Sequence, residues 1–121
     1  MNNKRTLIII AGLVLASVLA SCGPSTLNVT IKAGESGGAM NYDPVTITAQ
    51  VGQPVSIKFE NSGALEHTLL IDELNVQSDK VQPGQTATLT FTPDTAGTYM
   101  IYCDLPGHKE AGMVGTLTVN P

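Results

Sequence analysis

The sequence predicts an all-β protein, built as a two-sheet antiparallel sandwich with Greek-key connections. Three observations predict this fold class. Apolar and polar residues alternate with a period of two from residue 27 onward, turn-forming residues separate the alternating runs, and no stretch shows convincing helical periodicity. With 121 residues, the chain has room for one domain with one core.

Seven alternating runs are the candidate strands. Their inward-facing members are Leu27/Val29/Ile31, Val45/Ile47/Ala49/Val51, Val55/Ile57/Phe59, His67/Leu69/Ile71, Ala87/Leu89/Phe91, Tyr99/Ile101/Cys103 and Met113/Gly115/Leu117/Val119. Turn formers lie between the runs, for example at Gly52-Gln53-Pro54 and Pro106-Gly107. Residues 72–82 alternate poorly, and there we expect an irregular strand or a short helix.

The N-terminus has the composition of a secretory signal. Lys4 and Arg5 precede an apolar run over residues 7–20, which is too short for a typical membrane span. The run ends in Leu-Ala-Ser-Cys at Cys22, which resembles the lipobox of bacterial lipoproteins, where the signal is cut before the Cys and the Cys is acylated. The alternatives are an ordinary cleaved signal and an uncut signal anchor. In all three cases the domain lies outside the cytoplasm.

This reading divides the chain into three parts. We expect a lipoprotein signal peptide over residues 1–21, a short linker from the lipidated Cys22 over residues 22–26, and the folded domain over residues 27–121. Without residues 1–21 the chain keeps four Lys and ten acidic residues, a formal net charge of −6. This charge argues against nucleic acid as a partner and favours a basic one.

The cysteine count makes Cys103 informative. Secreted proteins usually pair their thiols, but this chain has only two Cys, and an acylated Cys22 would leave Cys103 without a partner. A lone thiol in an oxidising compartment is at risk of oxidation unless it is buried or bound to a metal. Cys103 is therefore a candidate metal ligand.

Four chemically suitable side chains converge on one end of the predicted sandwich. Cys103 lies at the last inward position of its strand, and Met113 opens the next strand on its own inward face. If the two strands form a hairpin, His108 belongs to the nine-residue loop between them. His67 opens another strand and meets the other three if that strand starts at the same end.

Two imidazoles and a thiolate, with a thioether as a weak fourth donor, are the ligand set of blue copper electron-transfer sites. Thiolate and thioether favour Cu(I), imidazole accepts either oxidation state, and a rigid compromise between the two keeps reorganisation small. Taken singly, each of these residues has an ordinary structural explanation: packing for the Cys and the Met, and exposure for a His. Their combination, in a chain with only two His, favours a copper site at His67, Cys103, His108 and Met113.

Residues 40–121 resemble the cupredoxin family, and the resemblance extends our expectation to a cupredoxin domain over residues 27–121. The loop Cys103-Asp-Leu-Pro-Gly-His108-Lys-Glu-Ala-Gly-Met113 has the C-x4-H-x4-M spacing of auracyanins, whereas plastocyanins have a shorter Cys-to-His spacing. Upstream, Tyr42-Asp43-Pro44 and Glu66-His67-Thr68 are also similar to the family. The resemblance implies one type 1 copper ion bound through Nδ1 of both His, with the far edge of His108 reaching solvent.

One residue departs from the family pattern. Many cupredoxins carry Asn directly after the first His, whereas Thr68 stands here. Its hydroxyl could replace the amide in joining the two ligand loops.

The expected function is therefore electron transport by Cu(II)/Cu(I) cycling and not catalysis. A copper oxidase or nitrite reductase needs a second copper site or a substrate pocket, for which the chain has no further His, and a binuclear centre needs a second Cys in the loop. The alternative is a copper carrier or resistance protein, although the chain lacks the Met-rich or His-rich surface common in such proteins. A metal-free adhesion sandwich is the remaining class.

The expected partners are redox proteins, such as a basic c-type cytochrome or a membrane oxidoreductase. We expect a monomer, held at the membrane by lipid on Cys22, on the periplasmic or outer surface. Electrons should leave through the edge of His108, within an apolar rim formed by Ala64, Leu65, Leu105 and Pro106. Tyr102 faces away from Cys103 and is expected to be plain surface.

Overall fold

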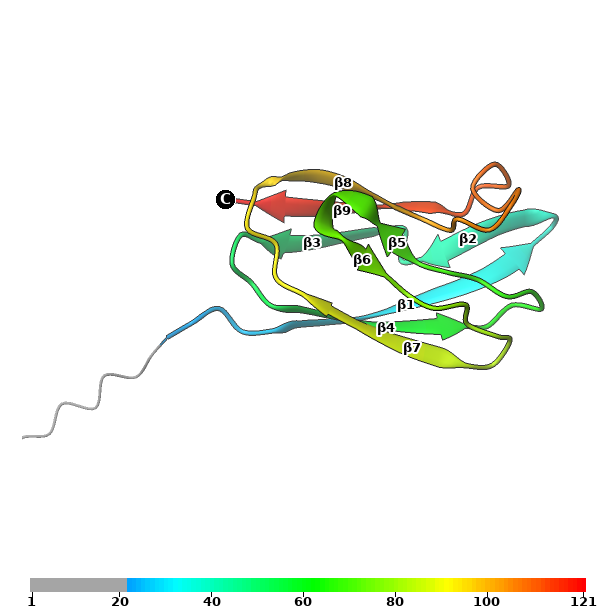
Figure 1. Cartoon of the computed structure of the whole chain (residues 1–121), viewed down its shortest axis with the longest axis horizontal. Helices are drawn as coiled ribbons and strands as arrows, with labels where there is room; N and C mark the ends of the chain where they lie inside the picture. The colour runs from blue at the N-terminus through cyan, green and yellow to red at the C-terminus, as the bar shows by residue number, and fades with distance from the viewer. Residues whose placement is uncertain (1–21) are drawn as a thin grey trace, which may run out of the picture.

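The alternating runs fold into a two-sheet sandwich in the computed structural model, which describes residues 22–121 (Figure 1). In this part of the chain the first sheet has the order β2-β1-β4-β7 and the second the order β3-β9-β8-β5-β6. The strands are β1 (Leu27–Ser36), β2 (Ala39–Asp43), β3 (Thr46–Gln50), β4 (Val55–Asn61), β5 (Leu70–Ile71), β6 (Val76–Gln77), β7 (Thr86–Phe91), β8 (Gly97–Tyr102) and β9 (Val114–Asn120). The all-β, two-sheet prediction is confirmed.

The pairing of the strands is mixed rather than wholly antiparallel. β1 pairs with β4 in parallel, and β3 pairs with β9 in parallel, while the other strand pairs are antiparallel. Between β1 and β4 the chain forms a hairpin and then visits the other sheet, so that β4 returns in the direction of β1. Alternation with a period of two reports which face of a strand is buried, not the direction of its neighbour, and the sequence pattern could not reveal the parallel pairs.

Two strands lie outside the seven expected runs. β1 continues to Ser36 and turns back into β2 through Gly37 and Gly38, whose φ angles are 60° and 85°. Positive φ at both central residues defines the tight hairpin turn that suits twisted strands, and glycine adopts it without steric cost. β6 lies within residues 72–82, where the chain also forms the 3-10 helix η1 (Asp72–Leu74). The expectation of an irregular strand or a short helix there is confirmed on both counts.

The core lies between the two sheets and is filled by large apolar side chains. Ile31, Ile57, Phe59, Ile71 and Leu117 are all fully buried. Burial of a side chain of this size contributes about 1.5–3 kcal/mol. The sheets therefore supply a scaffold that does not depend on the polar groups at its ends.

Three connections gather at one end of the sandwich. The β1–β2 turn, the β4–β5 loop and the β8–β9 loop lie at the right-hand end of Figure 1, whereas β1 begins and the chain ends at the left. The expected signal peptide, residues 1–21, lies outside the described residues. Within residues 22–121 no helix is long and apolar enough to cross a membrane.

Candidate metal centre

Two neighbouring strands hold three of the expected ligands. Cys103 follows β8 directly and Met113 directly precedes β9, and the Cys103 N–H donates to the Met113 carbonyl over 3.2 Å, which extends the ladder by one pair. His108 lies in the loop between them, and its carbonyl accepts the N–H of Met113 at 3.0 Å. The hairpin therefore brings Cys103, His108 and Met113 to one end of the sandwich, as expected.

His67 reaches the same end from the β4–β5 loop. It does not open a regular strand as expected, because β5 covers only Leu70–Ile71. Instead, His67 forms an isolated bridge with Val81, through backbone hydrogen bonds of 3.1 and 2.8 Å. The buried Asn61 side chain stabilises this loop by donating to the carbonyls of Leu65 and Val81 at 2.7 and 2.8 Å.

The metal-binding atoms of His67, Cys103 and His108 point toward one another. His67 Nδ1 and His108 Nδ1 lie 3.2 Å apart, Cys103 Sγ lies 3.5 Å from His108 Nδ1, and one donor atom of each residue falls within 4.8 Å of the others. Two nitrogens at this separation can both contact one ion at about 2 Å, the usual metal–imidazole length. The residues therefore fit a single metal ion.

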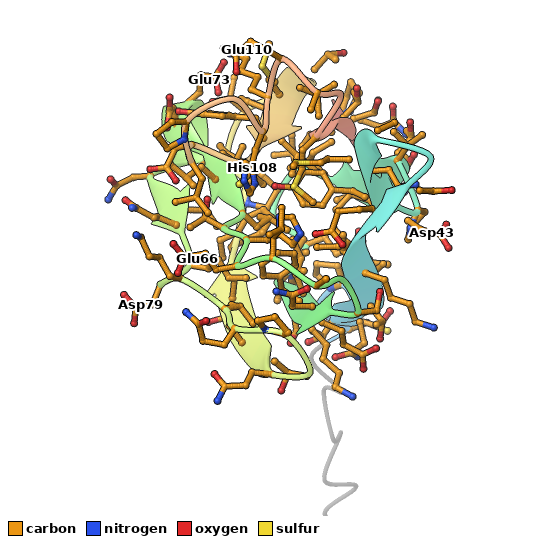
Figure 2. The ribbon with its side chains drawn as sticks, turned by 90° about the vertical axis from the view of Figure 1, so that its right-hand side faces the viewer. Asp43, Glu66, Glu73, Asp79, His108 and Glu110 are labelled. Carbon is orange, nitrogen blue, oxygen red and sulfur yellow. The ribbon has the colours of Figure 1, made fainter. Side chains whose placement is uncertain are left out.

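Burial of the site is uneven. His67, Cys103 and Met113 are fully buried, whereas His108 is only partly buried. Figure 2 views this end of the molecule, with His108 near its centre. The site thus has a dry interior side and one imidazole edge near solvent.

The sulfur of Cys103 has two donors close to it, both from Thr68. The Thr68 N–H lies 3.4 Å from Sγ and the hydroxyl lies 3.3 Å from it, but the same hydroxyl lies 2.7 Å from Asp104 Oδ1. A hydroxyl has one proton, and the shorter bond to a carboxylate is the stronger. We therefore assign the hydroxyl proton to Asp104 and leave the backbone N–H of Thr68 as the donor to the sulfur.

Thr68 also joins the two ligand loops. Its hydroxyl oxygen accepts the Asp104 N–H at 3.2 Å, so two hydrogen bonds connect the residue after His67 to the residue after Cys103. The hydroxyl takes the joining role expected of it. Sequence reasoning missed Asp104 as the partner of Thr68, although its position directly after Cys103 was a usable signal.

Two further residues, which sequence reasoning missed, form hydrogen bonds with Thr68 and His67. The buried Tyr42 hydroxyl donates to the Thr68 carbonyl at 2.6 Å. Burial, followed by the nearby Cys103 and Asp104, raises the Tyr42 pKa far above its ordinary value, so the hydroxyl keeps its proton. On the other side of the site, Glu35 Oε1 lies 2.7 Å from His67 Nε2.

The Glu35 carboxylate also accepts the N–H groups of Ala64 and Leu65, at 2.8 and 3.2 Å. Desolvation raises the Glu35 pKa, but the two backbone donors and the His67 imidazole together outweigh it and hold the pKa below its ordinary value. Glu35 is therefore a carboxylate at neutral pH. Nothing in the sequence pattern connects it with His67, 32 residues away.

The residues expected to form a rim around His108, and Tyr102 beside Cys103, differ in exposure. Of the four expected rim residues, Ala64, Leu65 and Pro106 are exposed and Leu105 is partly buried against the core. Tyr102 is partly buried, donates to Asp72 at 2.7 Å and lies under the Lys109 ammonium, 4.7 Å from the ring centroid. Tyr102 was expected to be plain surface, but it makes a hydrogen bond and a cation–π contact.

Fold and site together define a class: a small β-sandwich with a His, Cys and His metal centre at one end. The sequence model of the family described as cupredoxin-like domain matches residues 5–119 of this chain. Plastocyanin of Scenedesmus fuscus is 34% identical over 103 residues, covering 76% of this chain and 99% of the relative. The chain belongs to the cupredoxin family.

Solved structures agree with this assignment. The auracyanin of Roseiflexus castenholzii shares 25% sequence identity at a TM-score of 0.68, covering 80% of this chain and 99% of that protein. Auracyanin A of Chloroflexus aurantiacus, described as a "blue" copper protein, shares 27% at a TM-score of 0.64, covering 77% of this chain and 99% of that protein. The chain matches these small proteins along nearly their whole length.

Proposed function

We propose that this protein is a blue copper protein that shuttles single electrons between redox proteins, with His67, Cys103, His108 and Met113 as the copper ligands. The observation that carries the proposal is the convergence of two imidazole nitrogens and a thiol sulfur within 4.8 Å, at the end of the sandwich where Met113 is also buried. Soft sulfur and imidazole donors together suit both oxidation states of copper. The relatedness to auracyanin A supports copper as the ion.

Bound copper would supply the one-electron redox chemistry. The protein holds the donors still: Thr68 joins the two ligand loops, Asn61 fixes the loop that carries His67, and Tyr42 anchors the Thr68 backbone. Donors that are fixed by hydrogen bonds move little when the charge of the ion changes, which favours fast electron transfer. The partly buried ring of His108 gives electrons a short route to the surface.

An absorption spectrum tests this function. The copper-loaded protein should show an intense visible band from thiolate-to-Cu(II) charge transfer, which ascorbate bleaches and reoxidation restores. Cys103→Ser should abolish the band, whereas the control Cys22→Ser, at an exposed position in the linker, should keep it. A band retained in Cys103→Ser would remove this residue from the site. Release of copper on reduction would point instead to a copper carrier.

The partner proposed for this site is a basic redox protein, such as a c-type cytochrome or a membrane oxidoreductase. In Figure 2, Glu110 and Glu73 lie above His108, Glu66 and Asp79 lie below it to the left, and Asp43 lies to the right. Residues 22–121 carry four Lys against ten acidic residues. A partner could approach the apolar rim closely while opposite charges speed the encounter, an effect screened over about 10 Å at 0.1 M salt.

Stopped-flow electron exchange with a basic cytochrome tests the docking surface. Added salt should slow the wild type, and Leu105→Glu should slow exchange even at low salt, because it places a charge in the contact. Val51→Glu makes a similar change at an exposed position next to β3 and the C-terminal strand, and should leave the low-salt rate close to that of the wild type. A wild-type rate indifferent to salt would refute steering, and a normal rate in Leu105→Glu would move the electron exit elsewhere.

The location proposed is outside the cytoplasm, with the domain tethered by lipid on Cys22. Cys22 is exposed and precedes β1 by a few residues without regular secondary structure. β1 begins at the end of the sandwich opposite the β8–β9 loop (Figure 1). A tether there would leave the proposed copper end free to face a partner.

A further inference from the structure

One acidic side chain from the β1–β2 hairpin reaches the back of His67. Glu35 Oε1 lies 2.7 Å from His67 Nε2, and the imidazole is fully buried. A carboxylate oxygen accepts hydrogen bonds, so Nε2 of His67 is the donor in this contact. This leaves Nδ1, the atom that faces His108 and Cys103, as the nitrogen available to bind a metal ion.

The Glu35 carboxylate is bound by the backbone of residues 63–65. Both oxygens are held by backbone N–H groups, from Ala64 to Oε2 at 2.8 Å and from Leu65 to Oε1 at 3.2 Å. Gly63 leaves room above it, because a Cβ at this position would lie 2.7 Å from Oε1 and 2.8 Å from Cδ. Three hydrogen bonds, from the Ala64 and Leu65 N–H groups and from His67 Nε2, therefore fix the position of the Glu35 carboxylate.

We propose that Glu35 is a positioning residue for the copper site: it fixes the His67 tautomer and lowers the reduction potential of the bound ion. The inference rests on the proposed function and adds to it a residue outside the ligand set. A carboxylate on the far nitrogen orients a ligand imidazole and raises its basicity, and its charge favours Cu(II), the more positive state of the ion. The side chain is 22% exposed, so solvent screens part of its charge.

Variants of Glu35 separate charge from position. Glu35→Gln removes the charge and keeps an acceptor oxygen, whereas Glu35→Ala removes both. Gly63→Ala keeps the charge but displaces the carboxylate from its place. Asp94→Asn is the control, because this exposed acid lies in the β7–β8 loop, at the left-hand end of Figure 1, and its carboxylate accepts from the Thr95 hydroxyl.

We expect Glu35→Gln to weaken Cu(II) binding about tenfold relative to Cu(I), within the range found for outer partners of metal ligands. A tenfold change in that ratio corresponds to a rise of about 59 mV in a one-electron potential. Gly63→Ala should also raise the potential, and Asp94→Asn should leave it close to the wild-type value. An unchanged or lowered potential in Glu35→Gln would overturn the electrostatic part of the proposal.

Nitrogen NMR of the copper-free full chain gives an independent readout. Wild-type His67 should carry its proton on Nε2, and Glu35→Ala should lose this single tautomer while the strand signals remain. A wild-type proton on Nδ1, or a tautomer indifferent to Glu35→Ala, would overturn the positioning role. If the wild type binds no copper but Glu35 still controls the tautomer, the proposed function fails and the positioning role stands.

Discussion

Replacing Thr68 by Val tests how strongly the two ligand loops are joined. Val has almost the same shape as Thr, so the change removes two hydrogen bonds without opening a cavity. The bond to the Asp104 carboxylate, at 2.7 Å, belongs to the charged class that contributes about 1.5–3 kcal/mol, and the Asp104 N–H bond, at 3.2 Å, to the neutral class of about 0.5–1.5 kcal/mol. Asp104 is exposed, so water replaces part of what it loses. We expect the free energy of unfolding to fall by about 2 kcal/mol.

Thermal and denaturant unfolding of the copper-free protein measure this loss without the contribution of metal binding. A domain of this size loses about 4–8 °C in Tm per kcal/mol. Thr68→Ser keeps the hydroxyl and should lose much less. In a double-mutant cycle with Asp104→Ala, the two changes should be non-additive, because both remove the bond between the Thr68 hydroxyl and Asp104 Oδ1, whereas the bond donated by the Asp104 backbone N–H is lost only in Thr68→Val. Additive effects, or a neutral Thr68→Val, would refute the assignment of these hydrogen bonds.

Three further outcomes are expected. Met113→Gln should lower the reduction potential and keep the protein coloured, because an amide oxygen is a harder donor that favours Cu(II); an unchanged or raised potential in electrochemical titration would make Met113 a packing residue. Cys22→Ser should release the protein from membranes of its host without affecting copper binding, and mass spectrometry should find acyl chains only on the wild type; a wholly soluble wild type without lipid would contradict the tether. The hydrogen bond from Lys58 lowers the Glu60 pKa, so its small contribution to stability is present above the ordinary Glu pKa and lost as pH falls through the lowered value; Glu60→Gln should flatten this part of the stability profile measured by urea unfolding.

The sequence predicted the faces of the strands better than their partners. Alternation with a period of two identifies buried positions such as Ile57 and Leu117 whatever strand lies alongside. It was wrong for Val45 and Val51, which were expected to face inward but are exposed, because β3 covers only Thr46–Gln50 and both residues lie outside it. The β1–β2 hairpin was missed because its second half, from Ala39 to Asp43, is short and carries polar residues on its exposed face. The signal was present: two glycines between extended residues, Gly37 and Gly38, favour a two-residue hairpin turn.

The ligands could be predicted from the sequence for two reasons. The chain has only two His and two Cys, and a hairpin fixes the distance between Cys103 and Met113. Cys103 and Met113 are opposed by the ladder of β8 and β9, so the loop between them has to return to the same end. The groups that orient the ligands were harder to foresee. Glu35 is 32 residues from His67, and the contact depends on the parallel pairing of β1 with β4, which brings the end of β1 to the loop after β4.

Two acids, Glu35 of β1 and Asp104 of the β8–β9 loop, therefore determine the direction of the polar hydrogens around the site. Glu35 accepts a hydrogen bond from Nε2 of His67, and Asp104 accepts one from the Thr68 hydroxyl. Because each of these hydrogens points away from the centre, Nδ1 of His67 is left to bind the metal ion and the sulfur of Cys103 keeps only the backbone donor of Thr68. A sulfur with fewer hydrogen bonds donates more strongly and favours Cu(II), as does the negative charge of Glu35. Both acids are thus expected to lower the potential, and since they act on different ligands, the shifts of Glu35→Gln and Asp104→Asn should add in the double variant.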